Sequence, residues 1–227
     1  MKKSLPPVCF VKQRGAAFFS NGFVHESLVA GDDPGATWNN LQTSNLLFKA
    51  EILGWLIILI CDIVVAWAFY IFLKPIHRPL ALLGAWFRLT YAAMLGGSIL
   101  ILMVVLLLTN QTGYLSALDH EQLQAGTMLF LNAFELAWSA GLILFGGHLL
   151  IVGYVAFTSS SIPKVISVLL LLASVGYIVI HLCNVFLPQF EGMIAALEFL
   201  FSLPMMLGEL GFGLWLMFRG GRAAAKG

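Results

Sequence analysis

Four ionisable side chains lie deep within long apolar stretches of the sequence: Asp62, Arg88, His148 and Glu209. Counted at 1.5 Å per helical residue, each lies about 14–16 Å from the end of its stretch that is predicted below to be cytoplasmic. A charge at the centre of a bilayer costs about 2.5–3.5 kcal/mol on insertion scales, so it normally meets a partner or a wet cavity. We therefore predict one intramembrane polar layer to which four helices each contribute a residue.

Two interpretations of this layer remain open. In the structural one, Arg88 pairs with Asp62 or Glu209, while His148 is neutral, hydrogen-bonded and holds the helices in register. In the functional one, the same residues bind a small solute, an ion or a proton. The two acids and one arginine leave one negative charge, which a protonated histidine or a bound cation would balance.

A second polar layer is predicted near the outer boundary, about 27–38 Å from the inner helix ends. Its simplest explanation is interfacial solvation or local pairing, because long polar side chains reach headgroups and water from this depth. The alternative is an outer vestibule that leads to the inner layer. The residues concerned are Lys49, Glu51, Asn132, Glu135, His181, Asn184 and Glu198.

The composition explains why these charges matter. Of 227 residues, 60% are hydrophobic and only 10% are charged, with a mean hydropathy of +0.93. A soluble domain averages about 45–50% apolar and about 25% charged residues. The balance excludes a soluble enzyme and a secreted disulfide scaffold, and a net charge of +1 gives no basic surface for nucleic acid.

Five stretches are long enough to cross a bilayer, which takes roughly 20 mostly apolar residues. They are residues 52–73, 79–108, 127–157, 163–187 and 193–218. Because backbone polar groups in hydrocarbon must be satisfied within their own segment, each stretch is predicted to be a helix. The expected fold is an all-α polytopic bundle, with a tight turn over residues 74–79.

The N-terminal 46 residues are predicted to form a separate segment, and residues 47–227 a single membrane domain. Residues 15–24 are apolar but only half a span long, so they suggest a marginal or degraded sixth span or an interfacial helix. Residues 34–44 are predicted to form a short outer amphipathic helix, capped by the aspartate-rich turn before it.

Lysine and arginine in the short loops predict the orientation. These positive residues lie in the loop after the first span, in the loop between the third and fourth spans, and in the C-terminal tail. That side is predicted to be cytoplasmic, in a multi-pass protein of the plasma membrane (the inner membrane of a bacterium). The lipid bilayer is the expected partner, and the sequence defines no oligomeric state.

Short motifs in a fixed order carry a resemblance to a known family. The most telling is the run from Gly141 to Leu150, GLILFGGHLL, followed by Gly153-Tyr154. Others are Gly31-Asp32, Ala36-Thr37, Asn40-Leu41, Leu47-Phe48-Lys49, Leu73-Lys74-Pro75, Phe87-Arg88-Leu89, Ile162-Pro163-Lys164, Gly176-Tyr177, Phe186-Leu187-Pro188 and Gly208-Glu209. With these motifs the chain resembles an uncharacterised, mostly bacterial membrane family, the domain of unknown function 4386.

The resemblance implies a six-helix membrane protein of unknown activity, and it supplies no substrate and no catalytic residues. Where the family has a full first span, this chain has residues 10–24 with charges. We expect no cofactor, because two histidine ligands of a haem would have to meet in one plane, whereas His148 and His181 differ by about 14 Å in predicted depth. No catalytic motif is present.

The sequence leaves two hypotheses for function. One is small-solute or proton-linked transport through the inner polar layer. The other is a non-catalytic membrane sensor or assembly subunit, in which the buried charges are a structural latch.

Overall fold

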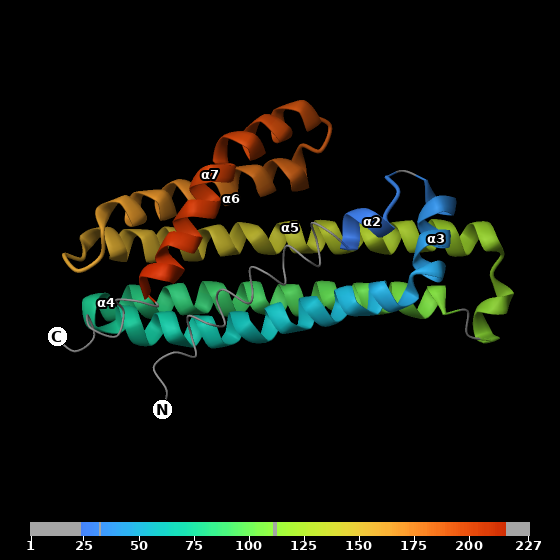
Figure 1. Ribbon diagram of the computed structural model, residues 1–227, viewed down its shortest axis with the longest axis horizontal. Helices are drawn as coiled ribbons and strands as arrows, with labels where there is room; N and C mark the ends of the chain where they lie inside the picture. Colours follow the sequence, from blue (N-terminus) through green and yellow to red (C-terminus); the bar gives the residue numbers. More distant parts are fainter. Residues whose placement is uncertain (1–23, 32, 111–112, 217–227) are drawn as a thin grey trace. The chain divides into compact units, whose positions relative to one another are not determined.

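A computed structural model describes residues 24–31, 33–110 and 113–216, and over these residues the regular secondary structure is all helix, joined by short turns (Figure 1). The predicted marginal span at residues 15–24 lies almost wholly outside the described residues. The elements in chain order are α2 (Glu26–Leu28), α3 (Pro34–Thr43), α4 (Asn45–Thr109), the 3-10 helix η2 (Gly113–Ala117), α5 (His120–Thr158), α6 (Lys164–Phe186) and α7 (Glu191–Trp215).

Four of these helices, α4 to α7, are long and apolar enough to cross a membrane. Three of the predicted spans correspond to α5, α6 and α7. The other two, residues 52–73 and 79–108, both fall within the 65 residues of α4.

The predicted turn over residues 74–79 is narrower than expected, since α4 loses helical geometry only at His77, which has φ −153° and ψ 90°. Pro79 cannot donate a backbone hydrogen bond, and its ring crowds the carbonyl four residues earlier, so the helix cannot continue unbroken here. The break divides α4 into two arms. The His77 side chain caps the start of the second arm, because its Nδ1 accepts the Leu80 N–H at 3.3 Å.

The described residues form two compact units. One, the Arg88 unit, contains Cys61–Ala93 and the chain from Ser139 onward. The other, the His25 unit, contains the described residues up to Ile60 together with Met94–Trp138.

In the His25 unit, α3 begins at the aspartate-rich turn as predicted, because the Asp33 carboxylate accepts the Ala36 N–H at 2.9 Å. Trp38 and Leu41 are the buried side of this helix. Two further hydrogen bonds join α3 to the segment before it: Ala30 N–H donates to the Thr37 hydroxyl at 3.0 Å, and Asn40 Nδ2 donates to the Leu28 carbonyl at 3.3 Å.

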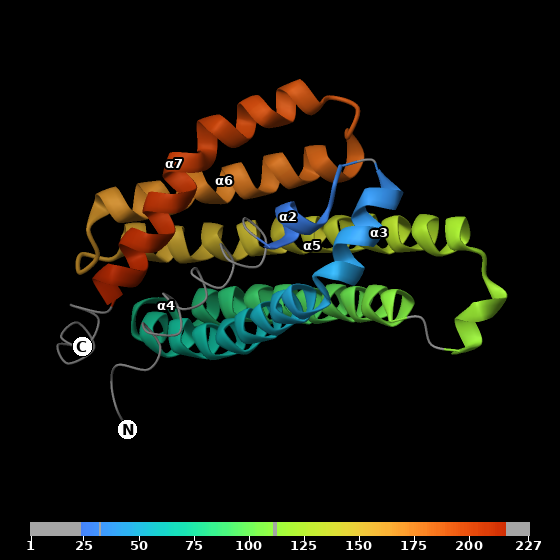
Figure 2. The same ribbon diagram turned by 45° about the vertical axis from the view of Figure 1, so that its right-hand side comes forward.

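In the Arg88 unit, α6 and α7 pack side by side through glycine (Figures 1 and 2). A Cβ atom placed on Gly208 would lie 2.9 Å from the Leu169 carbonyl oxygen, so only glycine permits this approach. Helix α7 contains Pro204 and changes direction along its length (Figure 2). Loss of a backbone hydrogen bond at a proline accounts for such a bend.

Candidate functional site

The first predicted site residues to meet are Arg88 and Asp62, which lie on opposite arms of α4. Arg88 Nη2 is 2.6 Å from Asp62 Oδ1, and both side chains are almost wholly inaccessible to solvent. A charge-assisted hydrogen bond of this length is among the stronger contacts a protein makes. It also fixes which faces of the two arms are turned toward one another.

His148 on α5 joins the same cluster. Its Nε2 lies 3.3 Å from Arg88 Nη1, and its Nδ1 lies 2.8 Å from the Gly84 carbonyl oxygen. Arginine has only donors and a carbonyl has only lone pairs, so Nε2 must accept and Nδ1 must donate. The geometry therefore requires a neutral imidazole with its proton on Nδ1.

Aromatic rings enclose the guanidinium and the imidazole. Phe69 stacks on His148 with a centroid separation of 5.5 Å and an interplanar angle of 4°. The Arg88 Cζ atom lies 5.5 Å from the Phe69 ring centroid and 5.1 Å from that of Phe145. Ring faces attract a cation while excluding water, which strengthens the ion pair between them.

Glu209, the fourth residue of the predicted layer, is also buried and lies in the same unit, on α7. Its Oε1 accepts a hydrogen bond from the Tyr177 hydroxyl on α6 at 2.8 Å. One turn further along α7, Phe212 packs edge-on against Phe69 at 5.4 Å. The sequence did not decide whether Arg88 pairs with Asp62 or with Glu209. In the structure, Arg88 forms an ion pair with Asp62.

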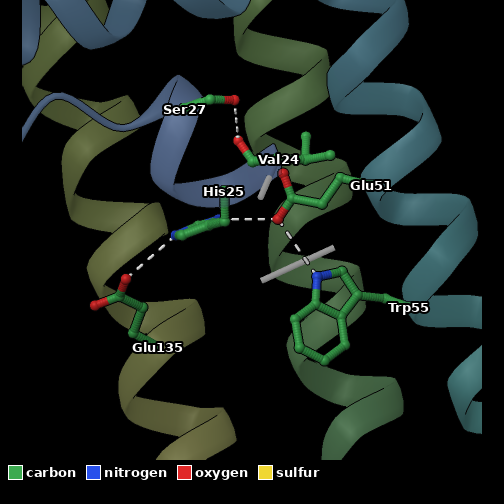
Figure 3. Close-up of polar contacts among 6 residues, drawn as sticks. All are labelled: Val24, His25, Ser27, Glu51, Trp55 and Glu135. Atoms are coloured by element: carbon green, nitrogen blue, oxygen red, sulfur yellow. Dashed lines mark hydrogen bonds and ion pairs between the residues drawn. The ribbon is translucent and has the colours of Figure 1, made fainter. Parts of the chain in front are cut away.

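The residues of the predicted outer layer have different surroundings. Glu51 on α4 and Glu135 on α5 meet at His25, which lies just before α2 (Figure 3). His25 Nδ1 is 2.8 Å from Glu51 Oε1, and His25 Nε2 is 3.2 Å from Glu135 Oε1. Trp55 Nε1 also donates to Glu51 Oε1, at 3.4 Å.

The remaining outer residues have surroundings of their own. His181 lies in the Arg88 unit, where its Nδ1 is 2.8 Å from the Ser139 hydroxyl and its ring stacks on Tyr177 at 6.0 Å. Asn184 is half-buried, whereas exposed side chains belong to Lys49, Asn132 and Glu198. Interfacial solvation of the exposed residues stays a prediction.

The electrostatics of His25 are unusual for a buried histidine. Burial lowers its pKa, but the hydrogen bonds to Glu135 and Glu51 and the charges of both carboxylates outweigh this and raise the pKa to about 9. His25 is thus an imidazolium at neutral pH.

Sequence reasoning missed several of these residues. His25 lies beyond the firm spans and carries no motif, so nothing local marked it as a partner of Glu51 and Glu135. Tyr177 was visible only as part of a family motif, and Phe69 and Phe145 are two of 18 phenylalanines. Only contacts between distant helices distinguish them.

Comparisons with known proteins assign the chain to a family. The chain is 28% identical to an uncharacterized protein of Archaeoglobus fulgidus over 170 residues, which is 75% of this chain and 83% of that protein. No solved structure matches the chain. The family model described as Domain of unknown function (DUF4386) matches residues 15–220, which include His25 and His148 with their partners. The chain therefore belongs to the DUF4386 family.

Proposed function

We propose that this protein is an integral membrane protein in which α4 crosses the bilayer twice and α5, α6 and α7 cross once each. At 1.5 Å per residue, the 65 residues of α4 would extend about 100 Å, roughly three times the thickness of a hydrocarbon core. The break at His77 divides it into two arms of spanning length. Lys74 and Arg78 at this break, together with Lys164, support a cytoplasmic side there and a cytoplasmic C-terminus.

Reporter fusions test this topology. Alkaline phosphatase or green fluorescent protein fused after residues 78, 119, 161 and 189 in a bacterial host should report inside, outside, inside and outside in turn. A fusion after residue 78 that reports the outside would overturn the double crossing of α4.

We further propose that Asp62, Arg88 and His148 form a structural latch in a non-catalytic membrane sensor or assembly subunit. The observation that carries this is the buried Asp62–Arg88 ion pair, extended through neutral His148 to the Gly84 carbonyl. The three side chains sum to zero charge, and each contact joins segments of the chain that are far apart in sequence. Such an arrangement stabilises one packing of the helices without requiring a ligand.

A double-mutant cycle tests the latch. Asp62→Leu and Arg88→Met should each lower the free energy of unfolding in detergent by about 3–5 kcal/mol, because each leaves an uncompensated buried charge. The double variant should cost much less than the sum, since it removes both charges together. Arg78→Met, at an exposed arginine, is the matched control. Additive losses in the double variant would contradict the latch.

A specific observation keeps transport as a second candidate. Glu209 is a buried carboxyl held by the Tyr177 hydroxyl, five residues beyond Pro204 in the bent helix α7. Acidic residues buried within membrane-spanning helices form proton relays in pumps and transporters. Uptake into proteoliposomes should then fall in Glu209→Gln and His148→Ala but not in Glu191→Gln, an exposed control on the same helix. Unchanged flux in both test variants would eliminate this candidate.

A further inference from the structure

The segment of residues 24–31 reaches two long helices through the buried side chain of His25. His25 is 5% exposed and reaches Glu51 on α4 through one ring nitrogen and Glu135 on α5 through the other (Figure 3). The segment also buries Val24 and Leu28, and it is hydrogen-bonded to α3 through the uncharged side chains of Thr37 and Asn40. His25 is thus the ionic link between this segment and the two long helices.

The protonation state of His25 follows from its two acceptors. A neutral imidazole has one N–H and one lone pair, so it can donate to only one carboxylate and would direct its lone pair at the other. The imidazolium has two N–H groups and satisfies both carboxylates at once. We propose that His25, Glu51 and Glu135 form a proton-binding clasp, which holds residues 24–31 against α4 and α5 when a proton is bound and releases them when it is lost.

The two halves of the clasp differ in strength. Glu51 is wholly buried and 2.8 Å from the imidazole, whereas the Glu135 side chain is 58% exposed and 3.2 Å away. Bulk water screens the contact with Glu135, so the contact with Glu51 is the firmer of the two. The exposed carboxylate of Glu135 gives the proton a route to and from the ring.

Other chemistry at this cluster is less well supported. Within the described part of the chain, no group of three or more histidine, cysteine or acidic residues has an arrangement that could hold a metal ion. The titratable groups that the described contacts bring to His25 are Glu51 from α4 and Glu135 from α5, and Phe134 adds an uncharged ring at 5.8 Å. The proton is therefore the ligand that this geometry favours.

The pH range of the clasp follows from the direction of the shift. The pKa of His25 rises from 6.5 to about 9 in the clasped state, so the clasp is fully formed below pH 6.5 and is lost as the pH rises through about 9. The equilibrium for opening should increase about tenfold per pH unit between these values and then level off. The total change is roughly 300-fold.

Hydrogen exchange measures this opening directly. In the purified full chain, the Val29 and Ala30 amides donate to the His25 carbonyl and the Thr37 hydroxyl, and their protection reports the segment. After correction for base-catalysed exchange, protection should fall between pH 6.5 and 9, while that of Ser44, which donates to the Asn40 carbonyl at the C-terminal end of α3, stays constant. Flat protection at Val29 and Ala30 would overturn the clasp.

Variants separate the clasp from general stability. His25→Gln should remove the pH dependence and leave the segment open throughout, whereas Glu121→Gln, at an exposed glutamate in the same unit, should behave as the parent chain. Glu135→Gln keeps an acceptor oxygen but removes one negative charge beside His25, so its transition should move to lower pH. An unmoved transition in Glu135→Gln, or an unchanged one in His25→Gln, contradicts the proposal.

A measurement on the unmodified chain keeps the proposal falsifiable even if a variant fails to fold. The ring nitrogens of ¹⁵N-labelled histidine have distinct chemical shifts in the imidazolium and the neutral imidazole. At pH 7 one histidine, assigned to His25 by its loss in His25→Gln or by contacts to Phe134, should be fully protonated. A neutral His25 at pH 7 would refute the clasp.

Discussion

Arg88 Nη1 donates to His148 Nε2 across 3.3 Å, and this contact decides the tautomer of a buried histidine. Because the guanidinium has no acceptor, the imidazole must present a lone pair to it and keep its proton on Nδ1, where the Gly84 carbonyl accepts it. A histidine that was a candidate proton carrier on sequence grounds is thereby engaged at both nitrogens.

His148→Phe should be destabilising although it conserves ring stacking on Phe69. The phenyl ring can neither accept from Arg88 nor donate to Gly84, which leaves buried polar groups to be satisfied elsewhere at a cost of about 1–3 kcal/mol. Thermal unfolding in detergent measures the change, with His120→Phe as an exposed control. Equal effects at the two positions would show that the hydrogen bonds of His148 contribute little.

Tyr177→Phe should lower stability through Glu209. The substitution removes only the hydroxyl that donates to the buried carboxyl at 2.8 Å, and a typical intramolecular hydrogen bond contributes about 0.5–1.5 kcal/mol. Tyr154→Phe removes a hydroxyl from a residue that is 54% exposed and should change stability by less than about 0.5 kcal/mol. Denaturant unfolding of the two variants compares them directly, and a neutral Tyr177→Phe would contradict this role.

Gly208→Ala should weaken the packing of α7 on α6. Its new Cβ would lie 2.9 Å from the backbone carbonyl of Leu169, which cannot move without shifting α6, so a cost of about 1–3 kcal/mol is expected. Gly211→Ala, on the same helix, meets nothing within 4 Å and should be neutral or slightly stabilising through helix propensity. Melting temperatures that shift equally in both variants would exclude close approach as the reason for Gly208.

The free energy of unfolding should depend on pH through His25. Its pKa is about 9 in the folded chain and 6.5 when unperturbed, so its stabilising contribution is complete below pH 6.5 and disappears as the pH rises through about 9. The difference between the parent chain and His25→Gln should therefore shrink by about 3 kcal/mol over this range. A constant difference from pH 6 to pH 10 would be inconsistent with an ionised His25.

The helical class, most of the helix boundaries and the identity of the costly buried residues could be predicted from the sequence alone. Hydropathy and length are local properties, so α5, α6 and α7 could be read from single stretches of chain. Even the break in α4 was placed to within a few residues, because prolines 75 and 79 restrict the backbone locally. What locality cannot provide is the rotation of one helix against another.

Which residues contact one another depends on how the helices pack, and the sequence alone does not show this. The predicted spans are apolar on every face, so their periodicity does not indicate whether Arg88 turns toward Asp62 or toward Glu209. Likewise, His25 and Glu135 are 110 residues apart, and their contact depends on how separate helices fold back on one another. Burial makes charges costly wherever they lie in the chain, but only packing determines the partner that offsets the cost.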